Sequence, residues 1–139
     1  MRLHIVARGK IGASPEAELV DRYLKRIAWP TMVTELGERG PVPPPAANSV
    51  TIVLDERGPA LSSTQLAKRL EGWRDGGKRE ARFLIGAADG HGDDVRDAAD
   101  LLLSFGPATW PHLLVRAMLA EQLFRATSIL ANHPYHRAG

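Results

Sequence analysis

The sequence contains no cysteine, which excludes disulfide bonds, thiolate metal ligands and cysteine nucleophiles. It has no apolar run long enough to span a membrane, and its first residues, MRLHIVARGK, lack the cleavage pattern of a signal peptide. Aromatic residues make up only 6% of the chain, and the formal charge is only +2. We therefore expect a cytoplasmic protein without a membrane partner, whose weak positive charge permits a polyanionic partner without requiring one.

Apolar runs and amphipathic segments alternate along the 139 residues, of which 44% are hydrophobic. Short runs rich in β-branched residues predict strands at residues 3–7, 31–36, 50–54 and 81–86. Segments with helical periodicity predict helices at residues 14–28, 62–77, 93–104 and 113–131. This order predicts an α/β fold with a largely parallel sheet, built as a single domain over residues 1–139.

Local signals support two of these helices and define one connector. Ser14 followed by Pro15 is typical of a helix start, and Ser62 with Gln65 has the spacing of a capping box. The segment GERGPVPPPAAN has four prolines in a dozen residues and cannot form a helix or a central strand. Residues 37–49 are therefore expected to form an extended connector within the domain.

Three segments could form a ligand site, because ligands of open α/β sheets bind beyond the carboxyl ends of the strands. LDERG follows the strand that ends at Leu54, IGAADG follows Ile85, and FGPATWPH lies before the last helix. Each contains glycine, which lets a ligand approach the backbone closely. None is a dinucleotide fingerprint or a phosphate-binding loop. IGAADG could also be a strand-to-helix turn, and FGPATWPH could be a loop pinned by two buried aromatic residues.

The last helix is apolar on most of its circumference, which predicts burial on several sides and a homodimer with this helix in the interface. Burial within one sheet layer is the alternative. Glu121 and Arg125 are four residues apart and can pair, whereas Arg116 lies on nearly the opposite side. His112, just before this helix, is a candidate general base, although a histidine in a loop is more often a surface residue.

The last eight residues, NHPYHRAG, hold two histidines, a tyrosine and an arginine where chains usually fray. His133 and His136 are three apart, a spacing that also invites a metal site. No further ligand obviously completes such a set, since Asp89 and His91 are only generic candidates. We therefore expect no metal at this tail.

The segment PHLLVRAMLAEQLFRATSILANHPYHR resembles the C-terminal signature of the RlmH family, the SPOUT-class methyltransferases of a pseudouridine N3 in 23S rRNA. The upstream order LD…G, IG…G and S…T-x-PH also resembles this family, and the similarity covers nearly the whole chain. Ala87 replaces the second glycine of the family's IGG, and Phe124 replaces its usual tyrosine. The proline connector replaces a basic helical segment, which bears on RNA docking because phosphate neutralisation needs Lys and Arg.

The resemblance implies a SPOUT fold with a C-terminal trefoil knot that binds S-adenosyl-L-methionine, and a homodimer acting on 23S rRNA within the ribosome or its large subunit. The cofactor-binding residues carried over by position are Leu54, Gly86, Phe105, Gly106, Pro107, Ala108, Thr109 and Trp110. The candidate catalytic residues are His136, Arg137, Tyr135, His112 and Arg125. The resemblance also implies that the tail is ordered near the cofactor of the other subunit.

Methylation of an imide nitrogen requires loss of its proton. The resemblance leaves open whether His136 or His112 takes that proton, or whether Arg137 and Arg125 stabilise the anion of the base. Tyr135 could stack on the target base or hydrogen-bond to it. The absence of cysteine is consistent with this chemistry, since carbon methylation through a thiol adduct is excluded.

Three alternatives remain at this point. A SPOUT methyltransferase for another RNA would keep the cofactor and the dimer but change the substrate. A non-catalytic ribosome- or RNA-binding module would have lost the cofactor, as Ala87 and the altered knot loop allow. A small metal hydrolase would depend on His133 and His136, and its activity would be sensitive to chelators.

Overall fold

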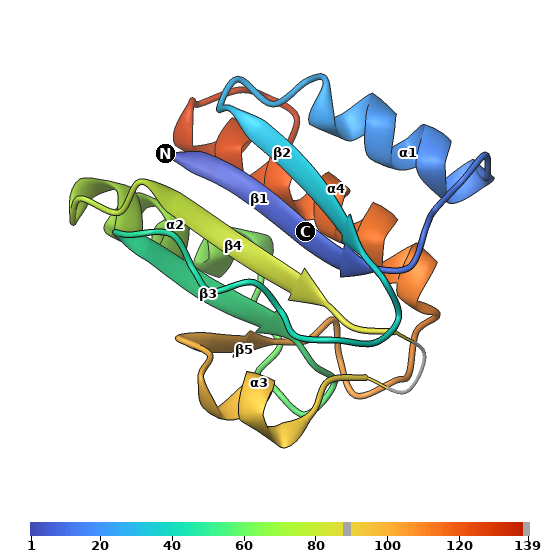
Figure 1. The fold of residues 1–139 in the computed structure, drawn as a ribbon. Helices are drawn as coiled ribbons and strands as arrows, with labels where there is room; N and C mark the ends of the chain where they lie inside the picture. Colours follow the sequence, from blue (N-terminus) through green and yellow to red (C-terminus); the bar gives the residue numbers. More distant parts are fainter. Residues whose placement is uncertain (88–89, 138–139) are drawn as a thin grey trace.

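The structure is a computed structural model that describes residues 1–87 and 90–137. Five parallel strands form one sheet in the order β2-β1-β4-β3-β5 (Figure 1). The strands are β1 (Arg2–Arg8), β2 (Thr31–Leu36), β3 (Ser49–Leu54), β4 (Glu80–Ile85) and β5 (Leu101–Leu103). The helices are α1 (Pro15–Leu24), α2 (Ser63–Asp75), α3 (Asp93–Asp97) and α4 (His112–Leu130). The α/β class and the parallel sheet are confirmed.

The two helix starts read from the sequence are confirmed in atomic detail. The Ser14 hydroxyl oxygen accepts a hydrogen bond from the Ala17 amide, and Pro15 is the first residue of α1. At α2 the Ser62 side chain accepts from the Gln65 amide while the Gln65 side chain accepts from the Ser62 amide. Both caps satisfy backbone donors that the first helical turn leaves without partners.

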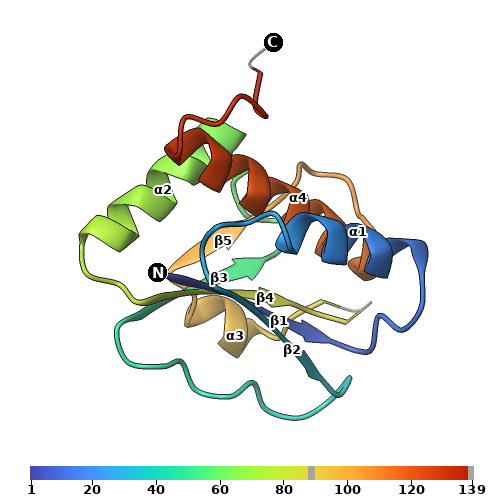
Figure 2. The same cartoon turned by 90° about the horizontal axis from the view of Figure 1, so that it is seen from above.

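The sheet separates two unequal layers. Helices α1, α2 and α4 cover one face, and α3 with the connector lies against the other (Figure 2). Alternate residues of each strand point to opposite faces, so Leu3 and Ile5 enter the larger core while Val6 enters the smaller one. The smaller core also holds Val42 of the connector and Val95 of α3. The larger layer therefore carries most of the apolar burial.

The prediction of a third helix over residues 93–104 is wrong for the second half of that segment. Helix α3 ends at Asp97, and the leucines that follow form β5, with Leu101 opposite Ile52 in parallel register. Asp100 fixes the start of this strand, because its carboxylate accepts a hydrogen bond from the Thr51 amide at 2.7 Å. A short apolar run gives no local signal that separates helix from strand. Pairing with β3 therefore determines that this segment forms a strand.

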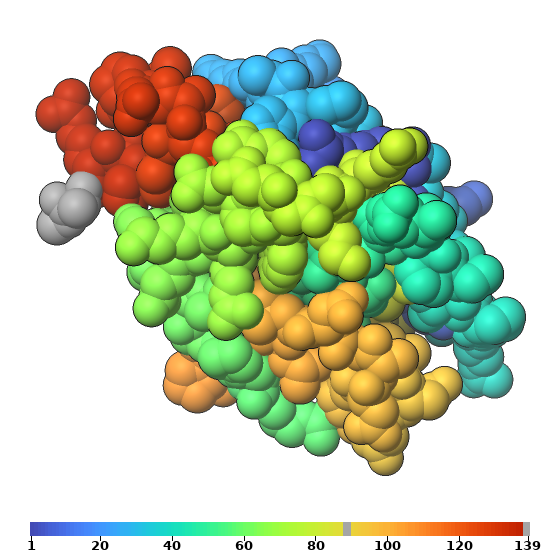
Figure 3. Space-filling model, turned by 90° about the vertical axis from the view of Figure 1, so that its left-hand side faces the viewer, coloured from blue at the N-terminus to red at the C-terminus, as the bar shows by residue number. Residues whose placement is uncertain are grey.

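The connector crosses the sheet's smaller layer without helix or strand over residues 37–48. The Arg8 guanidinium donates to the carbonyls of Gly37 and Gly40, and Arg82 donates to the carbonyl of Pro43. Side chains of the sheet thus supply the donors that hold this proline-rich backbone in place. Seen from the α2 side, the end of α4 and the tail lie at one corner and α3 at the opposite corner (Figure 3).

Helix α4 is largely buried within its own chain. Leu119, Ala120, Leu123 and Ala126 are fully buried, and the helix packs against α1 and α2. Burial on several sides is thus achieved by one chain, so the argument for a homodimer from this helix alone is weakened. The homodimer remains a prediction. Within the described residues, none of the helices has both the length and the apolarity needed to cross a membrane.

Candidate functional site

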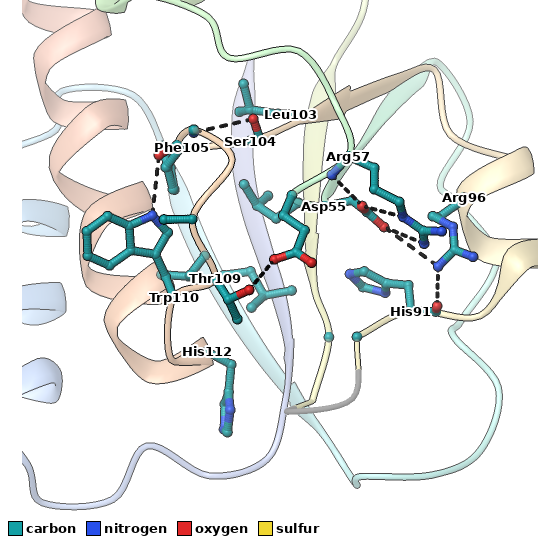
Figure 4. A pocket seen from close by; sticks show the side chains of 18 of the residues that line it. Asp55, Arg57, His91, Arg96, Leu103, Ser104, Phe105, Thr109, Trp110 and His112 are labelled. Carbon is teal, nitrogen blue, oxygen red and sulfur yellow. Dashed lines mark hydrogen bonds and ion pairs between the residues drawn. The ribbon is translucent and has the colours of Figure 1, made fainter.

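A cavity of about 390 Å³ lies where the loops after β3, β4 and β5 meet the start of α4 (Figure 4). The strands are parallel, so their carboxyl ends fall on one edge of the sheet, and the loops that leave them face the same space. The sequence-based expectation that the LDERG, IGAADG and FGPATWPH segments form one site is supported by this arrangement, as far as the described residues extend. Residues Ala88 and Asp89 of the second segment lie outside them.

Seven of the eight residues named from the resemblance line this cavity: Leu54, Gly86, Phe105, Gly106, Ala108, Thr109 and Trp110. Pro107 belongs to the same loop but is not part of the lining. Gly86 leaves no room for a side chain, because a Cβ there would lie 2.9 Å from the Gly90 carbonyl carbon. Gly106 has a φ of 99°, a left-handed conformation that favours glycine.

Side-chain hydrogen bonds hold the loop after β5 across the cavity. The Thr109 hydroxyl donates to a carboxylate oxygen of Glu56 at 2.7 Å, which joins this loop to the one after β3. The Trp110 indole N–H donates to the Phe105 carbonyl at 3.3 Å. Trp110 is nevertheless 42% exposed, and so the aromatic ring forms part of the cavity rim.

A charged wall that the sequence did not predict closes the cavity on the α3 side. Asp55 accepts hydrogen bonds from the Arg57 amide at 2.9 Å and from its guanidinium, and Arg96 approaches it at 3.6 Å. Burial opposes ionisation of Asp55, but the hydrogen bonds and charge of Arg57 outweigh it and hold its pKa below the usual value. The only signal for this wall in the sequence was a carboxylate, that of Asp55, directly after a buried strand.

The five candidate catalytic residues do not lie together in one chain. His112, the first residue of α4, lines the cavity. Arg125 lies 13 residues further along the same helix, about 20 Å away at 1.5 Å per residue. Tyr135 and His136 contact the helix around Arg125, and Arg137 is exposed beyond them. One chain therefore presents two separate groups, one at each end of α4.

The tail group is a connected network on the last turns of α4. The Tyr135 hydroxyl donates to Glu121 Oε2 at 3.0 Å, and Arg125 pairs with the same carboxylate at 2.9 Å, as the four-residue spacing predicts. The Arg125 guanidinium also lies 4.7 Å from the centre of the Tyr135 ring, and its Nη1 is 3.3 Å from His136 Nδ1. Burial, together with the hydrogen bond to Glu121, raises the pKa of Tyr135 to about 12. These contacts explain why the tail is ordered.

Phe124, the residue that departs from the family's tyrosine, supports this network by packing. Its ring centre lies 4.6 Å from that of Tyr135 and 6.4 Å from that of His133. The chain reverses after α4 at Asn132, which has a φ of 57°, and the His133 amide then donates to the Ser128 carbonyl. The Phe124 ring thus helps to hold the tail against the end of α4.

The tail histidines do not form a metal centre of the usual kind. His133 Nδ1 accepts a hydrogen bond from the Tyr135 amide, and His136 Nδ1 faces Arg125. Over residues 1–87 and 90–137, no cluster of three or more potential His, Asp or Glu ligands is present. Asp89, one of the generic candidates, lies outside those ranges.

Comparison with known proteins gives concordant results. The family model described as "Predicted SPOUT methyltransferase" matches residues 41–136. The "Ribosomal RNA large subunit methyltransferase H" of Novosphingobium aromaticivorans is 65% identical over 141 residues, covering all of both chains. The protein of the same name from Zymomonas mobilis is 54% identical over 142 residues, again covering all of both.

A solved structure extends the comparison to the fold. A probable methylase family protein from Haemophilus influenzae superposes with a TM-score of 0.58, over 99% of this chain and 70% of that one. The two sequences are only 9% identical, so this likeness concerns the fold alone. The cavity at the strand ends therefore lies in a fold that is shared well beyond the range of sequence similarity.

Proposed function

This chain belongs to the SPOUT methyltransferase family and is a large-subunit ribosomal RNA methyltransferase of the RlmH type, and we propose that it methylates N3 of a pseudouridine in 23S rRNA. The methyl donor in this proposal is S-adenosyl-L-methionine. The substrate is the ribosome or its large subunit, which implies a cytoplasmic location. The observation that carries the proposal is the cavity at the strand ends, lined by seven of the eight residues that the resemblance assigns to the cofactor.

The residues present suit this cofactor. A cavity of about 390 Å³ is within the range of small-molecule sites, which is about 300–1,000 Å³. Its walls combine apolar side chains such as Leu54 and Val115 with backbone of the Gly86 and Gly106 turns. An adenosyl group offers both apolar surface and hydrogen-bond donors to such walls.

S-adenosyl-L-methionine, when bound, supplies a methyl group on a sulfonium, and the electron pair of the broken S–CH₃ bond stays on sulfur. The chain must hold the N3 atom of the base in line and accept its proton. His112, a residue of the cavity wall, accepts that proton in this proposal.

The tail residues enter the proposal through a second copy of the chain. Arg125, Tyr135, His136 and Arg137 lie at the other end of α4 from the cavity of their own chain. A homodimer that places this end of one chain beside the cavity of the other would bring these tail residues next to His112 of the second chain. Arg125 and Arg137 would then stabilise the anion of the base, and His136 is the alternative proton acceptor. The trefoil knot likewise remains a prediction.

The test combines calorimetric titration with S-adenosyl-L-methionine and radiolabelled methyl transfer to ribosomes that lack this modification. Binding, with one methyl group incorporated at the pseudouridine, is the expected result. Binding without incorporation would overturn the substrate and indicate another RNA. If no binding occurred, the enzymatic proposal would be wrong, and a non-catalytic ribosome- or RNA-binding module would be left.

A further inference from the structure

The loop after β1 contains a lysine whose backbone is anchored on both sides. The Gly9 carbonyl accepts a hydrogen bond from Arg116 Nη2 at 3.2 Å, and the Ile11 amide donates to Glu35 Oε2 at 2.8 Å. Arg116 and Glu35 also form an ion pair with each other. Lys10, between the two anchored residues, is exposed. Its backbone is therefore held in place while its side chain remains accessible to solvent.

The ion pair that anchors this loop is buried on the arginine side. The Arg116 side chain is 1% exposed, against 33% for Glu35. The hydrogen bond from Arg116, together with that from the Ile11 amide, holds the pKa of Glu35 below its usual value, so the pair is charged at neutral pH. A buried ion pair contributes little net stability compared with apolar residues of similar size. Stability alone does not account for this pair, whereas its contacts do fix the position of the loop.

The anchored loop lies at the cavity edge of the sheet. β1 pairs in parallel with β4, so both strands end at the edge where Gly86 lines the cavity. Arg116, which binds the loop, lies four residues after His112 of the cavity wall, about 6 Å along α4. Figure 1 shows the end of β1 next to the first turns of this helix. A polyanion that reaches the cavity on this side therefore passes close to Lys10.

The positive charge of Lys10 is not matched by a neighbouring carboxylate. No described residue forms an ion pair with its ammonium group. The charge of Glu35 is matched by Arg116, and the Arg8 guanidinium binds backbone carbonyls of the connector rather than a carboxylate. The end of β1 thus carries two cations, Arg8 and Lys10, without a carboxylate partner among the described residues.

We propose that Lys10 is a substrate-binding residue whose ammonium group contacts a phosphate of the RNA beside the target nucleotide, and that the Arg116–Glu35 pair positions it. This inference rests on the proposed function. Lysine binds a phosphate as a compact point charge, and such contacts orient a nucleic acid without reading its sequence. Lys10 would therefore hold the target nucleotide at the cavity while other groups carry out methyl transfer.

Two substitutions of Lys10 separate its charge from its shape, and a third variant is the matched control. Lys10→Gln removes the charge and Lys10→Arg keeps it, whereas Lys68→Gln removes the same charge from an exposed lysine of α2 that does not line the cavity. Methyl transfer to ribosomes that lack the modification gives KM and kcat over a range of salt concentrations. Calorimetry with S-adenosyl-L-methionine and thermal melting check the cofactor site and the fold.

The expected result is a rise in KM for ribosomes of about fivefold in Lys10→Gln, with kcat and cofactor affinity unchanged. The slope of log kcat/KM against log salt should become shallower by about 0.7–0.9, as for one lost phosphate contact. Lys10→Arg and Lys68→Gln should behave like the parent. An unchanged KM in Lys10→Gln would overturn the inference, and so would an equal rise in Lys68→Gln or a loss confined to kcat or to cofactor affinity.

A charge-neutral double substitution tests the positioning pair. Glu35→Leu combined with Arg116→Met removes one charge of each sign and both backbone anchors, and apolar replacement of a buried pair is often neutral for stability. We expect the folded double variant to show the same rise in KM and the same change in salt slope as Lys10→Gln. Adding Lys10→Gln to it should cause no further loss, because the contact is already gone. Additive losses would overturn the positioning role.

Cosedimentation with ribosomes separates failure of this inference from failure of the proposed function. A parent that binds S-adenosyl-L-methionine and ribosomes but does not methylate them contradicts the proposed function. The difference in ribosome affinity between the parent and Lys10→Gln then still decides the inference: weaker binding supports it, and equal binding overturns it. A parent that does not bind ribosomes overturns both.

Discussion

Both ends of α4 hold reactive groups in place, but they do so by different means. At its start, His112 joins a cavity whose shape depends on glycine turns and on loops that leave three parallel strands. At its end, Glu121 and Arg125 form an ion pair and hold the tail through the Tyr135 hydroxyl and a cation–π contact to the Tyr135 ring. The first end is shaped by backbone, and the second is held by side chains.

This difference determines how each end should respond to substitution. A backbone-shaped cavity is sensitive to volume, because close-packed turns cannot move to admit even one methyl group. A side-chain network is sensitive to charge and to hydrogen-bonding groups, because removing one member leaves the others without partners. Substitutions in the glycine turns of the cavity should therefore affect cofactor binding, and those at the end of α4 should affect catalysis.

The largest effect on cofactor affinity is expected from Gly86→Ala. The new Cβ would lie 2.9 Å from the Gly90 carbonyl carbon and 3.0 Å from its oxygen, both of them backbone atoms. Overpacking of this kind costs about 1–3 kcal/mol. Since this turn forms part of the cavity wall, we expect the affinity for S-adenosyl-L-methionine to fall by about tenfold or more. Calorimetric titration measures the change.

Gly72→Ala is the matched control. Gly72 lies within α2, where an added Cβ meets no atom within 4 Å outside the local backbone. Alanine in a helix interior is favoured over glycine by about 1 kcal/mol, so this variant should melt slightly higher and bind the cofactor normally. Equal cofactor affinity in the Gly86→Ala and parent proteins would show that the turn can adjust, and would contradict the backbone-shaped cavity.

Arg125→Ala should have the largest effect on catalysis, and none on cofactor affinity. The substitution removes the partner of Glu121, the cation above Tyr135 and the contact to His136. Removal of one group that stabilises developing charge typically lowers kcat by about 100-fold or more. We expect a loss of that order in methyl transfer to ribosomes, with cofactor affinity unchanged. A parallel loss of cofactor affinity would contradict the separation of the two ends.

Mixing two inactive variants tests whether the two ends meet across subunits. His112→Ala is defective at the cavity and Arg125→Ala at the tail. If one chain's tail serves the other's cavity, a mixed dimer has one intact site, and an equal mixture regains roughly a quarter of the parental activity. If both ends serve the same site within one chain, mixing restores nothing.

Most of the fold could be predicted because its signals are local. The runs that form β1 to β4 are apolar over most of their length, and the caps at Ser14 and Ser62 lie within three residues of their partners. Strand β5 was missed because Leu101 to Leu103 follow a short helix without any turn signal. Its identity depends on Asp100 and Ile52, which only the folded sheet brings together.

The candidate site also has parts that the sequence predicts and parts that it does not. The cavity followed from a general rule about strand ends, and the Glu121–Arg125 pair followed from a four-residue spacing. The contact between Asp55 and Arg96 could not be predicted, because it joins segments 41 residues apart that meet only in the folded protein. The fold-back of Tyr135 onto Glu121 likewise depends on the chain reversal after α4.

A smaller effect is expected from the titration of Tyr135, which makes the stability of the folded state depend on pH. Its pKa of about 12, against an ordinary value of 10, means that the folded state favours the neutral phenol. The resulting stabilisation is fully present below pH 10 and is lost as the pH rises toward 12. Ultraviolet absorbance of the folded parent should show a tyrosinate phase near pH 12. This phase should be missing in Tyr135→Phe, which retains only Tyr23. If the phase persists in that variant, the Tyr135–Glu121 hydrogen bond is not its origin.

The smallest effect is expected from Glu56→Gln, which tests whether a charge contributes to ligand binding at the cavity end of α4. Glutamine can still accept the Thr109 hydrogen bond but carries no charge. S-adenosyl-L-methionine has a sulfonium charge that its product, S-adenosylhomocysteine, lacks. Exposed charge pairs contribute about 0.2–1 kcal/mol, so affinity for the donor should fall by no more than about fivefold.

Affinity for S-adenosylhomocysteine should stay unchanged in Glu56→Gln, and calorimetry with both ligands measures the two values. The control is Glu38→Gln, an exposed carboxylate of the connector that does not line the cavity. Equal losses for both ligands would mean that Glu56 acts by holding the Thr109 loop, and Thr109→Val should then reproduce them. A loss for the donor alone would show that this end of α4, although shaped by backbone, also selects its ligand by charge.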